Sequence, residues 1–364
     1  KLRSTGAIVL GKTNLTEFAD FVSDVMPSGY SGNGGVVKNP HGIEYGRGQG
    51  SSVGSAAAVA ASLCMFAIGS ETQNSIQTPA SYSSVVGYKP SVGLVSRFGV
   101  VPLVPSQDSP GPLTRSVADA KLVGAVIAGA DMRDTASLLA QGLAIDSFQS
   151  ESLSNIRVGV LRRQIADRPE FSELMPLFEG VLQKLIQAGV AVIDPCDLPS
   201  AEQLQEVRSS VFRTEFKAAL NTFLEEHASP CGITSMSDLI AWNEAHAEHI
   251  PYGQSLLVAS NETKGLSDPD YIRDRLRDLA LSRTSGVDAA LSMYDVDVLV
   301  APMGAAAKLT GKAGVPVVAI PCGVTSNGIP FGITVISKFG SDARLLAIAE
   351  KIESVVGARK LPLV

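Results

Sequence analysis

The stretch from Gly48 to Ala80, GQGSSVGSAAAVAASLCMFAIGSETQNSIQTPA, decides the fold expected for this chain. It holds two serine clusters in small-residue surroundings, with Ser51 and Ser75 separated by 24 positions and joined by an apolar run. The pattern predicts a glycine- and serine-rich turn, a buried helix, a short strand and a second polar turn. This order of elements brings both serine clusters to one end of a sheet, which is typical of a functional site.

Length and composition are those of a globular chain with no electrostatic footprint for nucleic acid. The 364 residues are 45% hydrophobic and 18% charged, which is too apolar for an intrinsically disordered chain. The net charge is −6 and the basic residues are scattered, so no nucleic-acid partner is expected. The length allows one large α/β domain or two or three smaller ones.

Signals for metal sites, disulfides and membrane spans are weak. The four cysteines show no CxxC or ligand spacing, and His246 and His249 form a possible ligand pair without an evident third ligand. We therefore expect no metal and no cofactor. The longest apolar run, Ser55 to Ile68, has 14 residues and is shorter than the roughly 20 that a membrane span needs.

Apolar runs and helical periodicity predict an α/β fold. The predicted strands are residues 7–10, 65–68, 85–88, 99–102, 156–161, 189–193, 296–301, 315–320 and 331–336. The predicted helices are residues 15–25, 52–63, 115–128, 174–188 and 342–356. Residues 201–295 are mostly helical with breaks, which indicates a helical region over about 200–290 beside the sheet.

The residues alone leave more than one interpretation of the serine clusters. A glycine-rich turn that opens a helix can bind a phosphate, but this one lacks the lysine and Ser/Thr of a P-loop. Close helix packing accounts for Gly54, Ser55 and residues 56–58. Ser51 and Ser75 together favour nucleophilic chemistry, because a serine hydroxyl needs a proton acceptor and a second serine can relay the proton to a neutral lysine.

The two clusters resemble the signature of the amidase signature family, a GGSSGGS-type segment followed by a TxGGSIRxPA-type segment. Here the segments read GQGSSVGS over residues 48–55 and TQNSIQTPA over residues 72–80. The resemblance continues through GKTNLTEFA, VVGYKPSVGLVSRFGVVPLVPSQDSPGPLTRSVADA, SMSDLIAWNEAHAEH, GLSDPDYIRDR and GIPFGITVIS, and is strongest to the peptide-amidase branch. It implies a single domain over residues 1–364, an α/β fold with a mixed, twisted central sheet and helices on both faces.

The resemblance also implies roles for individual residues. Ser75 matches the nucleophile that forms the acyl-enzyme, and Ser51 matches the bridging serine, which in the family sits on an unusual cis peptide. The backbone N–H groups of Thr72, Gln73, Asn74 and Ser75 correspond to the oxyanion hole. Ser52 is expected to support the hydrogen-bond network. Asp108 and Arg115 look like a scaffold pair that holds the loop between them.

The chain departs from the family pattern in two ways. The catalytic lysine of the family lies in a KDN-like strand upstream of GKTN, and no such segment occurs here. We therefore expect this lysine on a missing N-terminal segment, or a second chain that completes the site. The glycines before the nucleophile are replaced by Gln73 and Asn74; asparagine tolerates left-handed geometry, whereas Gln73 sets a bulky amide beside the oxyanion position.

The function implied is hydrolysis of small carboxamides or C-terminal peptide amides through an acyl-enzyme on Ser75. The alternatives are a catalytically inactive amidase-like protein that binds a ligand, and an amidotransferase subunit that supplies ammonia to a partner. An upstream KDN-like lysine favours the enzyme, and co-purification with a second subunit favours the amidotransferase.

Overall fold

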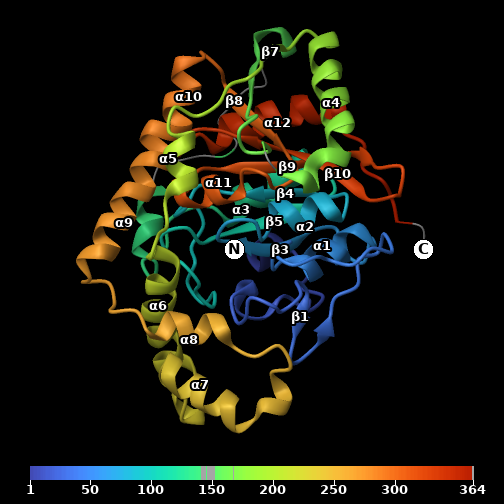
Figure 1. The fold of residues 1–364 in the computed structure, drawn as a ribbon. Helices are drawn as coiled ribbons and strands as arrows, with labels where there is room; N and C mark the ends of the chain where they lie inside the picture. Colours follow the sequence, from blue (N-terminus) through green and yellow to red (C-terminus); the bar gives the residue numbers. More distant parts are fainter. Residues whose placement is uncertain (141–144, 146–151, 167, 363–364) are drawn as a thin grey trace.

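A mixed sheet crosses the centre of the molecule (Figure 1). The computed structural model describes residues 1–140, 145, 152–166 and 168–362. Within them eight strands follow the order β3-β5-β4-β9-β10-β8-β6-β7. Their bounds are β3 Ala67–Glu71, β4 Val86–Lys89, β5 Ser109–Thr114, β6 Arg157–Val160, β7 Ala191–Ile193, β8 Val298–Pro302, β9 Val317–Val324 and β10 Pro330–Ile336. The pairs from β3 through β8 are antiparallel, and β6 is parallel to β8 and β7.

Helices and a small hairpin complete the described secondary structure. The α-helices are α1 Val53–Ala60, α2 Gln77–Tyr82, α3 Val117–Ile127, α4 Met175–Gln187, α5 Ala201–Glu206, α6 Val211–His227, α7 Met236–Ala245, α8 Ser255–Asn261, α9 Pro269–Leu279, α10 Asp288–Met293, α11 Ala307–Ala313 and α12 Asp342–Val356. A π-helix spans Ala280–Val287 between α9 and α10. Strands β1 Tyr30–Ser31 and β2 Gly35–Val36 form the hairpin, and 3-10 turns cover Leu2–Thr5, Glu17–Asp20, Thr135–Ala140, Leu153–Asn155, Pro169–Leu174, Ser229–Cys231 and Ala247–His249.

Helices cover both faces of the sheet, as alternate residues of β4 show. Gly87 faces α2, since a side chain there would meet Ile76 and Ala80. The next residue, Tyr88, faces the other side, where its hydroxyl donates to Asp342 of α12 at 2.6 Å. Because successive side chains of a strand point to opposite faces, α2 and α12 lie on opposite sides of the sheet. The predicted fold class, a mixed sheet with helices on both faces, is confirmed.

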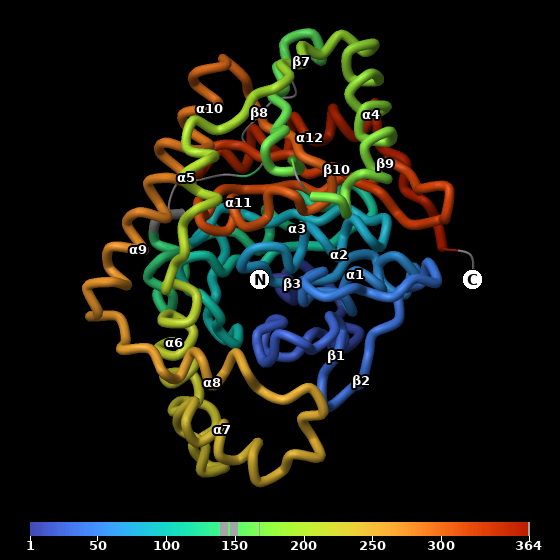
Figure 2. Tube along the Cα trace, viewed as in Figure 1, coloured from blue at the N-terminus to red at the C-terminus, as the bar shows by residue number. Residues whose placement is uncertain are grey.

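The segment from α5 to α10 is largely helical and lies beside the sheet (Figures 1 and 2). Its helix α6 buries Phe216 and Leu220 in a second apolar core that also contains Val22 and Met26 from the N-terminal part of the chain. Residues that are far apart in sequence therefore share this core.

Two predicted strands are wrong, and two elements near the serines were not predicted. Residues 7–10 form no strand, and Ile8, Val9 and Leu10 are 83%, 59% and 74% exposed. Residues 99–102 lie in a turn and coil. Strand β5 was missed because its sequence, SPGPLT, contains two prolines and a glycine, which normally argue against a strand. Helix α2 was missed because it is short and contains Pro79.

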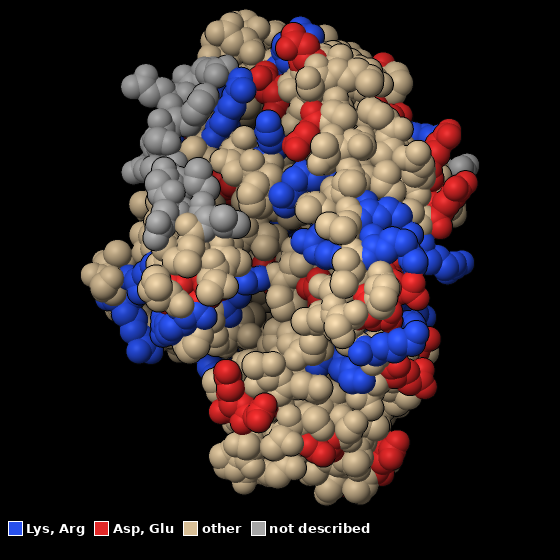
Figure 3. Space-filling model, turned by 90° about the vertical axis from the view of Figure 1, so that its left-hand side faces the viewer, with Lys and Arg blue, Asp and Glu red and all other residues tan. Residues whose placement is uncertain are grey.

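The surface shows no segregation of charge on the face drawn in Figure 3, where acidic and basic side chains are intermixed. None of the helices in the described part of the chain is both long and apolar enough to span a bilayer.

Candidate active site

The two serine clusters meet in space at the edge of the sheet. Ser52 N–H donates to the carbonyl of Ser75 at 3.0 Å, which joins the start of α1 to the turn before α2. Gly50 makes this approach feasible: it has φ of 93°, and a Cβ there would lie 2.9 Å from the carbonyl oxygen of Asn74. The predicted meeting of the two clusters is thus present at the level of the backbone.

The serine side chains differ in what they bind. Ser52 Oγ donates to the carbonyl of Ser70 at 3.0 Å and accepts from its N–H at 3.1 Å, so it pins α1 to β3. Ser51 and Ser75 are only 5% and 4% exposed. Within the described residues their hydroxyls have no hydrogen-bond partner, neither each other nor a third group. Two nearly buried hydroxyls are therefore left available for a ligand.

The backbone of the turn also has unused donors. Across the part of the chain that the structure describes, the N–H groups of residues 72–75 donate to no protein acceptor. Gln73 and Asn74 are absent from the residues with positive φ, so this turn does without the left-handed geometry that the family's glycines permit. The peptide bonds at Ser51 are trans, unlike the cis peptide that the resemblance implied, since Asp194–Pro195 is the cis bond found among the described residues.

A buried carboxylate that sequence reasoning missed holds the turn from behind. Glu71 is 1% exposed, and its Oε2 accepts from the N–H groups of Ile76 and Gln77 at 2.7 and 2.8 Å. Its Oε1 accepts from the side-chain amide of Gln77 at 2.6 Å. Burial raises the pKa of Glu71, and the nearby Lys89 opposes that shift. An acidic residue at the end of an apolar strand is the sequence signal that could have found it.

Asp108 holds the turn from the opposite strand, as expected, but Arg115 is not its partner. Asp108 Oδ1 accepts from Thr72 Oγ1 at 2.6 Å. Its Oδ2 accepts from the N–H groups of Leu103 and Val104, both at 2.9 Å. The predicted Asp108–Arg115 pair is wrong, because no ion pair joins them among the described residues and the charge that acts on Asp108 is that of Arg97.

The side-chain amide of Gln73 pairs with that of Gln107. Its Nε2 donates to Gln107 Oε1 at 3.2 Å. Helix α11 passes over this pair, and Gly311 makes room for it, because a Cβ there would lie 2.7 Å from Gln73 Cγ. Gln107 was not singled out from the sequence, although it stands opposite Gln73 when the β3–β5 register is extended.

The most deeply buried lysine does not contact the serines. Lys89 is fully buried, and its Nζ donates to the carbonyl of Val315 at 2.8 Å. Burial lowers the pKa of Lys89 to about 8. No lysine in the described residues hydrogen-bonds to Ser51 or Ser75.

In the possible histidine ligand pair, the ring of His246 is engaged by Trp242. His246 stacks on Trp242 with 4.2 Å between ring centroids, and its Nδ1 lies 2.8 Å from the carbonyl oxygen of Trp242. The described residues contain no group of three or more His, Cys, Asp and Glu side chains placed to hold a metal.

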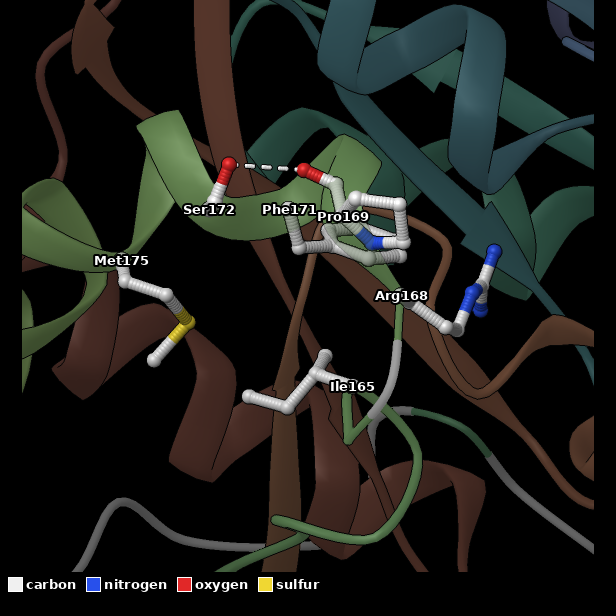
Figure 4. Close-up of a pocket in the computed structure, with 6 residues that line it drawn as sticks. All are labelled: Ile165, Arg168, Pro169, Phe171, Ser172 and Met175. Carbon is white, nitrogen blue, oxygen red and sulfur yellow. Dashed lines mark hydrogen bonds between the residues drawn. The ribbon is translucent and has the colours of Figure 1, made fainter.

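Two hollows flank this region. One of about 280 Å³ is lined by Thr72 and Asp108 and is bounded by α6. The other, of about 480 Å³, is lined by Ile165, Arg168, Pro169, Phe171, Ser172 and Met175 (Figure 4). In Figure 4 Ile165 and Met175 point toward this second hollow, whereas Arg168 points away.

The second hollow is linked to α2 through the loop after β8. Arg168 Nη1 donates to the carbonyl of Ala305 at 3.3 Å. The neighbouring Gly304 packs against Thr78, which stands one helical turn after Ser75, and a Cβ at Gly304 would clash with the Thr78 hydroxyl. Arg168, at the rim of the second hollow, is thus linked to α2 through this loop.

Comparison with known proteins identifies the family. A model of the Amidase family matches residues 1–312. The chain is 32% identical to a probable amidase of Arabidopsis thaliana, covering 100% of this chain and 70% of the relative. It is 31% identical to a glutamyl-tRNA(Gln) amidotransferase component of Prochlorococcus marinus, covering 96% and 74%. The crystal structure of a peptide amidase from Stenotrophomonas maltophilia matches with a TM-score of 0.87 and 37% identity, covering 100% and 76%. The chain therefore belongs to the amidase family.

Proposed function

We propose that the protein hydrolyses small carboxamides or C-terminal peptide amides through an acyl-enzyme on Ser75. The Ser75 hydroxyl attacks the amide carbon while its proton passes to Ser51, which passes its own proton to a base. The C–N bond breaks, and the nitrogen takes up a proton and leaves as ammonia or an amine. Water then attacks the Ser75 ester, which releases a carboxylic acid and restores the hydroxyl.

One observation carries the proposal: within the described residues, two hydroxyls without a hydrogen-bond partner stand beside a run of backbone donors that also lack one. Neither hydroxyl is among the fully enclosed side-chain atoms without a partner, so both face open space that a substrate can enter. In this proposal the N–H groups of residues 72–75, which donate to no acceptor in the described residues, receive the negative charge that develops on the carbonyl oxygen. Ser52 takes a supporting role, because its hydroxyl is committed to Ser70.

The base is part of the proposal. Lys89 has a suitable pKa of about 8, but its amine is bonded to Val315 and is not hydrogen-bonded to Ser51. We therefore assign the base to a lysine outside residues 1–364, from a further segment or a second chain, as the family resemblance implies. A neutral lysine next to Ser51 would accept the relayed proton.

The hollow in Figure 4 suggests what the acyl part carries. Its lining is mainly apolar, with Ile165, Phe171 and Met175, and Arg168 at its rim bonds to the loop that packs against Thr78 of α2. We place an apolar side chain of the substrate there. The name of the solved peptide amidase agrees with a substrate that ends in a carboxamide.

The test is ammonia release by the full-length protein from peptide amides, compared with its Ser75→Ala variant. We expect the variant to lose at least roughly 10³-fold in kcat/KM, because no other hydroxyl takes the place of the nucleophile. A fluorophosphonate probe should label the wild type at Ser75. Equal turnover by the two proteins would exclude the mechanism, and an unlabelled, inactive wild type would favour a binding protein.

A second candidate is the ammonia-supplying component of an amidotransferase, because a relative with 31% identity carries that name. The solved glutamyl-tRNA(Gln) amidotransferase component from Thermotoga maritima matches less well than the peptide amidase, with a TM-score of 0.69 against 0.87. Co-purification with a second protein that raises glutamine turnover would favour this candidate.

A further inference from the structure

The amides of Gln73 and Gln107 form a pair that leaves half of its hydrogen-bonding capacity unused. Gln73 Nε2 donates to Gln107 Oε1 at 3.2 Å. In the described residues no partner is found for Gln73 Oε1 or for Gln107 Nε2. Neither of these two atoms is among the fully buried side-chain atoms that lack a partner in the described residues. Both are therefore accessible from open space. Gln107 is nevertheless buried, with only 3% of its surface exposed.

The pair is held in place by the ends of two strands. The register between β3 and β5 pairs Ser70 with Pro110 and Glu71 with Ser109. The same register continues into the turn, where Thr72 contacts Asp108 and Gln73 contacts Gln107. Because successive side chains alternate in direction, Gln73 shares the face of Glu71, which is the α2 face, and not the face of Thr72.

Packing fixes the orientation of the pair. Gly311 of α11 has no side chain, and a Cβ there would lie 2.7 Å from Gln73 Cγ and 3.1 Å from Gln107 Oε1. On the other side, Gln77 Nε2 donates to the carbonyl of Gln73 at 2.9 Å. The two amides are therefore fixed in orientation, unlike those of a mobile surface glutamine, and Gln73 is only two residues before Ser75 in sequence.

The unused atoms suit a peptide group. A primary amide pair of this kind presents one acceptor, the free oxygen, beside one donor, the free amino group. A peptide group presents the complementary set, an N–H and a C=O. A plain alkyl or aryl amide has no second amide to offer besides the one that is cleaved.

We propose that the Gln73–Gln107 pair selects substrates whose acyl part contains a peptide group, by hydrogen-bonding that group next to the scissile carboxamide. The proposal rests on the proposed function and names the specificity determinant of the same site. A site built to hydrogen-bond a polar group discriminates against an analogue that lacks it, because its own polar atoms are then left unpaired. The side chains of Gln73 and Gln107 contact the substrate away from the reacting bond, whereas the backbone N–H of Gln73 serves the oxyanion.

The experiment compares two substrates that differ by the peptide group: N-acetylphenylalanine amide and 3-phenylpropionamide. The full-length wild type should prefer the first. Gln107→Met keeps the approximate shape of the side chain but removes both its free donor and the acceptor that holds Gln73, and should lower kcat/KM for the first substrate by about 10- to 100-fold, mostly through KM. Turnover of 3-phenylpropionamide should stay within about twofold. Gln183→Met on the exposed face of α4 is the matched control and should change neither.

The outcomes separate the two proposals. Equal losses on both substrates, or no loss on either, would overturn the role of the pair while the hydrolase stands. Wild type that is active on both substrates without preference would do the same. Wild type that hydrolyses neither substrate would remove the proposed function and this inference with it. A Gln73→Met/Gln107→Met double variant should add little to the loss that Gln107→Met causes on N-acetylphenylalanine amide, because the pair acts as a unit.

Discussion

The two edges of the central sheet are built from the same kinds of element but bury different side chains. At one edge, the α1–β3–α2 unit buries Glu71, Gln77 and the hydroxyls of Ser51 and Ser75. At the other edge, the β6–α4–β7 unit buries apolar side chains such as Phe178 and Leu185. Its charged groups remain near the surface, where Arg162 pairs with Glu179 at 2.6 Å.

The comparison separates the energetic roles of the two edges. Burying apolar surface stabilises the fold directly, whereas burying a polar group costs free energy unless a partner is provided. At the serine edge most of those costs are offset by hydrogen bonds, such as those of Glu71 and Ser52. Among the described residues of this edge, we assign the hydroxyls of Ser51 and Ser75, which lack a partner, to the reaction, whereas Gln77 Oε1 is buried without a partner and is given no role.

The largest effect that would test this comparison is on activity. Ser51→Ala should lower kcat/KM by about 10³-fold with little change in stability, because the hydroxyl has no hydrogen-bond partner to lose among the described residues. The matched variant Ser52→Ala should instead cost about 2 kcal/mol of unfolding free energy, since it breaks two hydrogen bonds to Ser70. Kinetics and urea unfolding measure both. A fully active Ser51→Ala variant would end the distinction between the two serines.

The apolar edge should respond in stability alone. Leu185→Ala removes a fully buried side chain from α4 and should destabilise the protein by about 3 kcal/mol through the cavity that it leaves. Its kcat at low temperature, corrected for the folded fraction, should equal that of the wild type. A large fall in kcat would mean that the β6–α4–β7 unit also positions the site.

Two tightly packed glycines, Gly69 at the serine edge and Gly159 at the apolar edge, allow the same substitution to be compared at both edges. An added Cβ at Gly69 would press on Ser52 Oγ, and one at Gly159 would press on Cys196. Gly69→Ala and Gly159→Ala should each destabilise the protein by about 1–3 kcal/mol, as overpacking does. Only Gly69→Ala should also lower kcat, by way of the Ser52–Ser75 contact. Equal kcat values for the two variants would contradict this.

A dependence of stability on pH is expected from Lys89 of β4, which lies two strands inward from the serine edge. Lys89 has a pKa of about 8 in the folded protein because it is buried, below its ordinary 10.5. Between these values the unfolded chain keeps a proton that the folded chain has released. The contribution of Lys89 to the free energy of unfolding should therefore rise with pH across this window, by about 1 kcal/mol per pH unit. Urea titrations of the wild type and Lys89→Met at several pH values should differ by this slope. Parallel curves would exclude it.

The sequence predicted the regular parts of the fold because their side-chain patterns are unambiguous. Helix α12 has the predicted bounds, 342–356, and Ser116 caps α3 by accepting from Asp119 N–H at 3.1 Å. Residues 7–10 misled because an apolar run predicts a strand only where a neighbouring strand is available to pair with it, and here they are exposed.

The serine turn was predicted from its motif, but its supporting contacts were not. The Thr72–Asp108 and Gln73–Gln107 contacts depend on strand register, which brings together residues more than 30 positions apart and leaves no local signal in the sequence. The orientation of Gln73 depends likewise on Gly311, from a helix late in the chain. Contacts of this kind follow from tertiary packing, so composition and spacing do not reveal them.

The hydroxyls that α1 and its cap direct at β3 have a consequence for self-association. An outer strand normally offers its free amide and carbonyl groups to any other extended chain, which is how sheets grow into aggregates. Ser52 occupies both backbone groups of Ser70, and Ser55 donates to the carbonyl of Ile68 at 2.9 Å. Because these backbone groups are already hydrogen-bonded, a strand of another molecule has few groups of β3 to pair with. The serine-rich segment that contains the proposed site therefore also protects this edge of the sheet from edge-to-edge polymerisation.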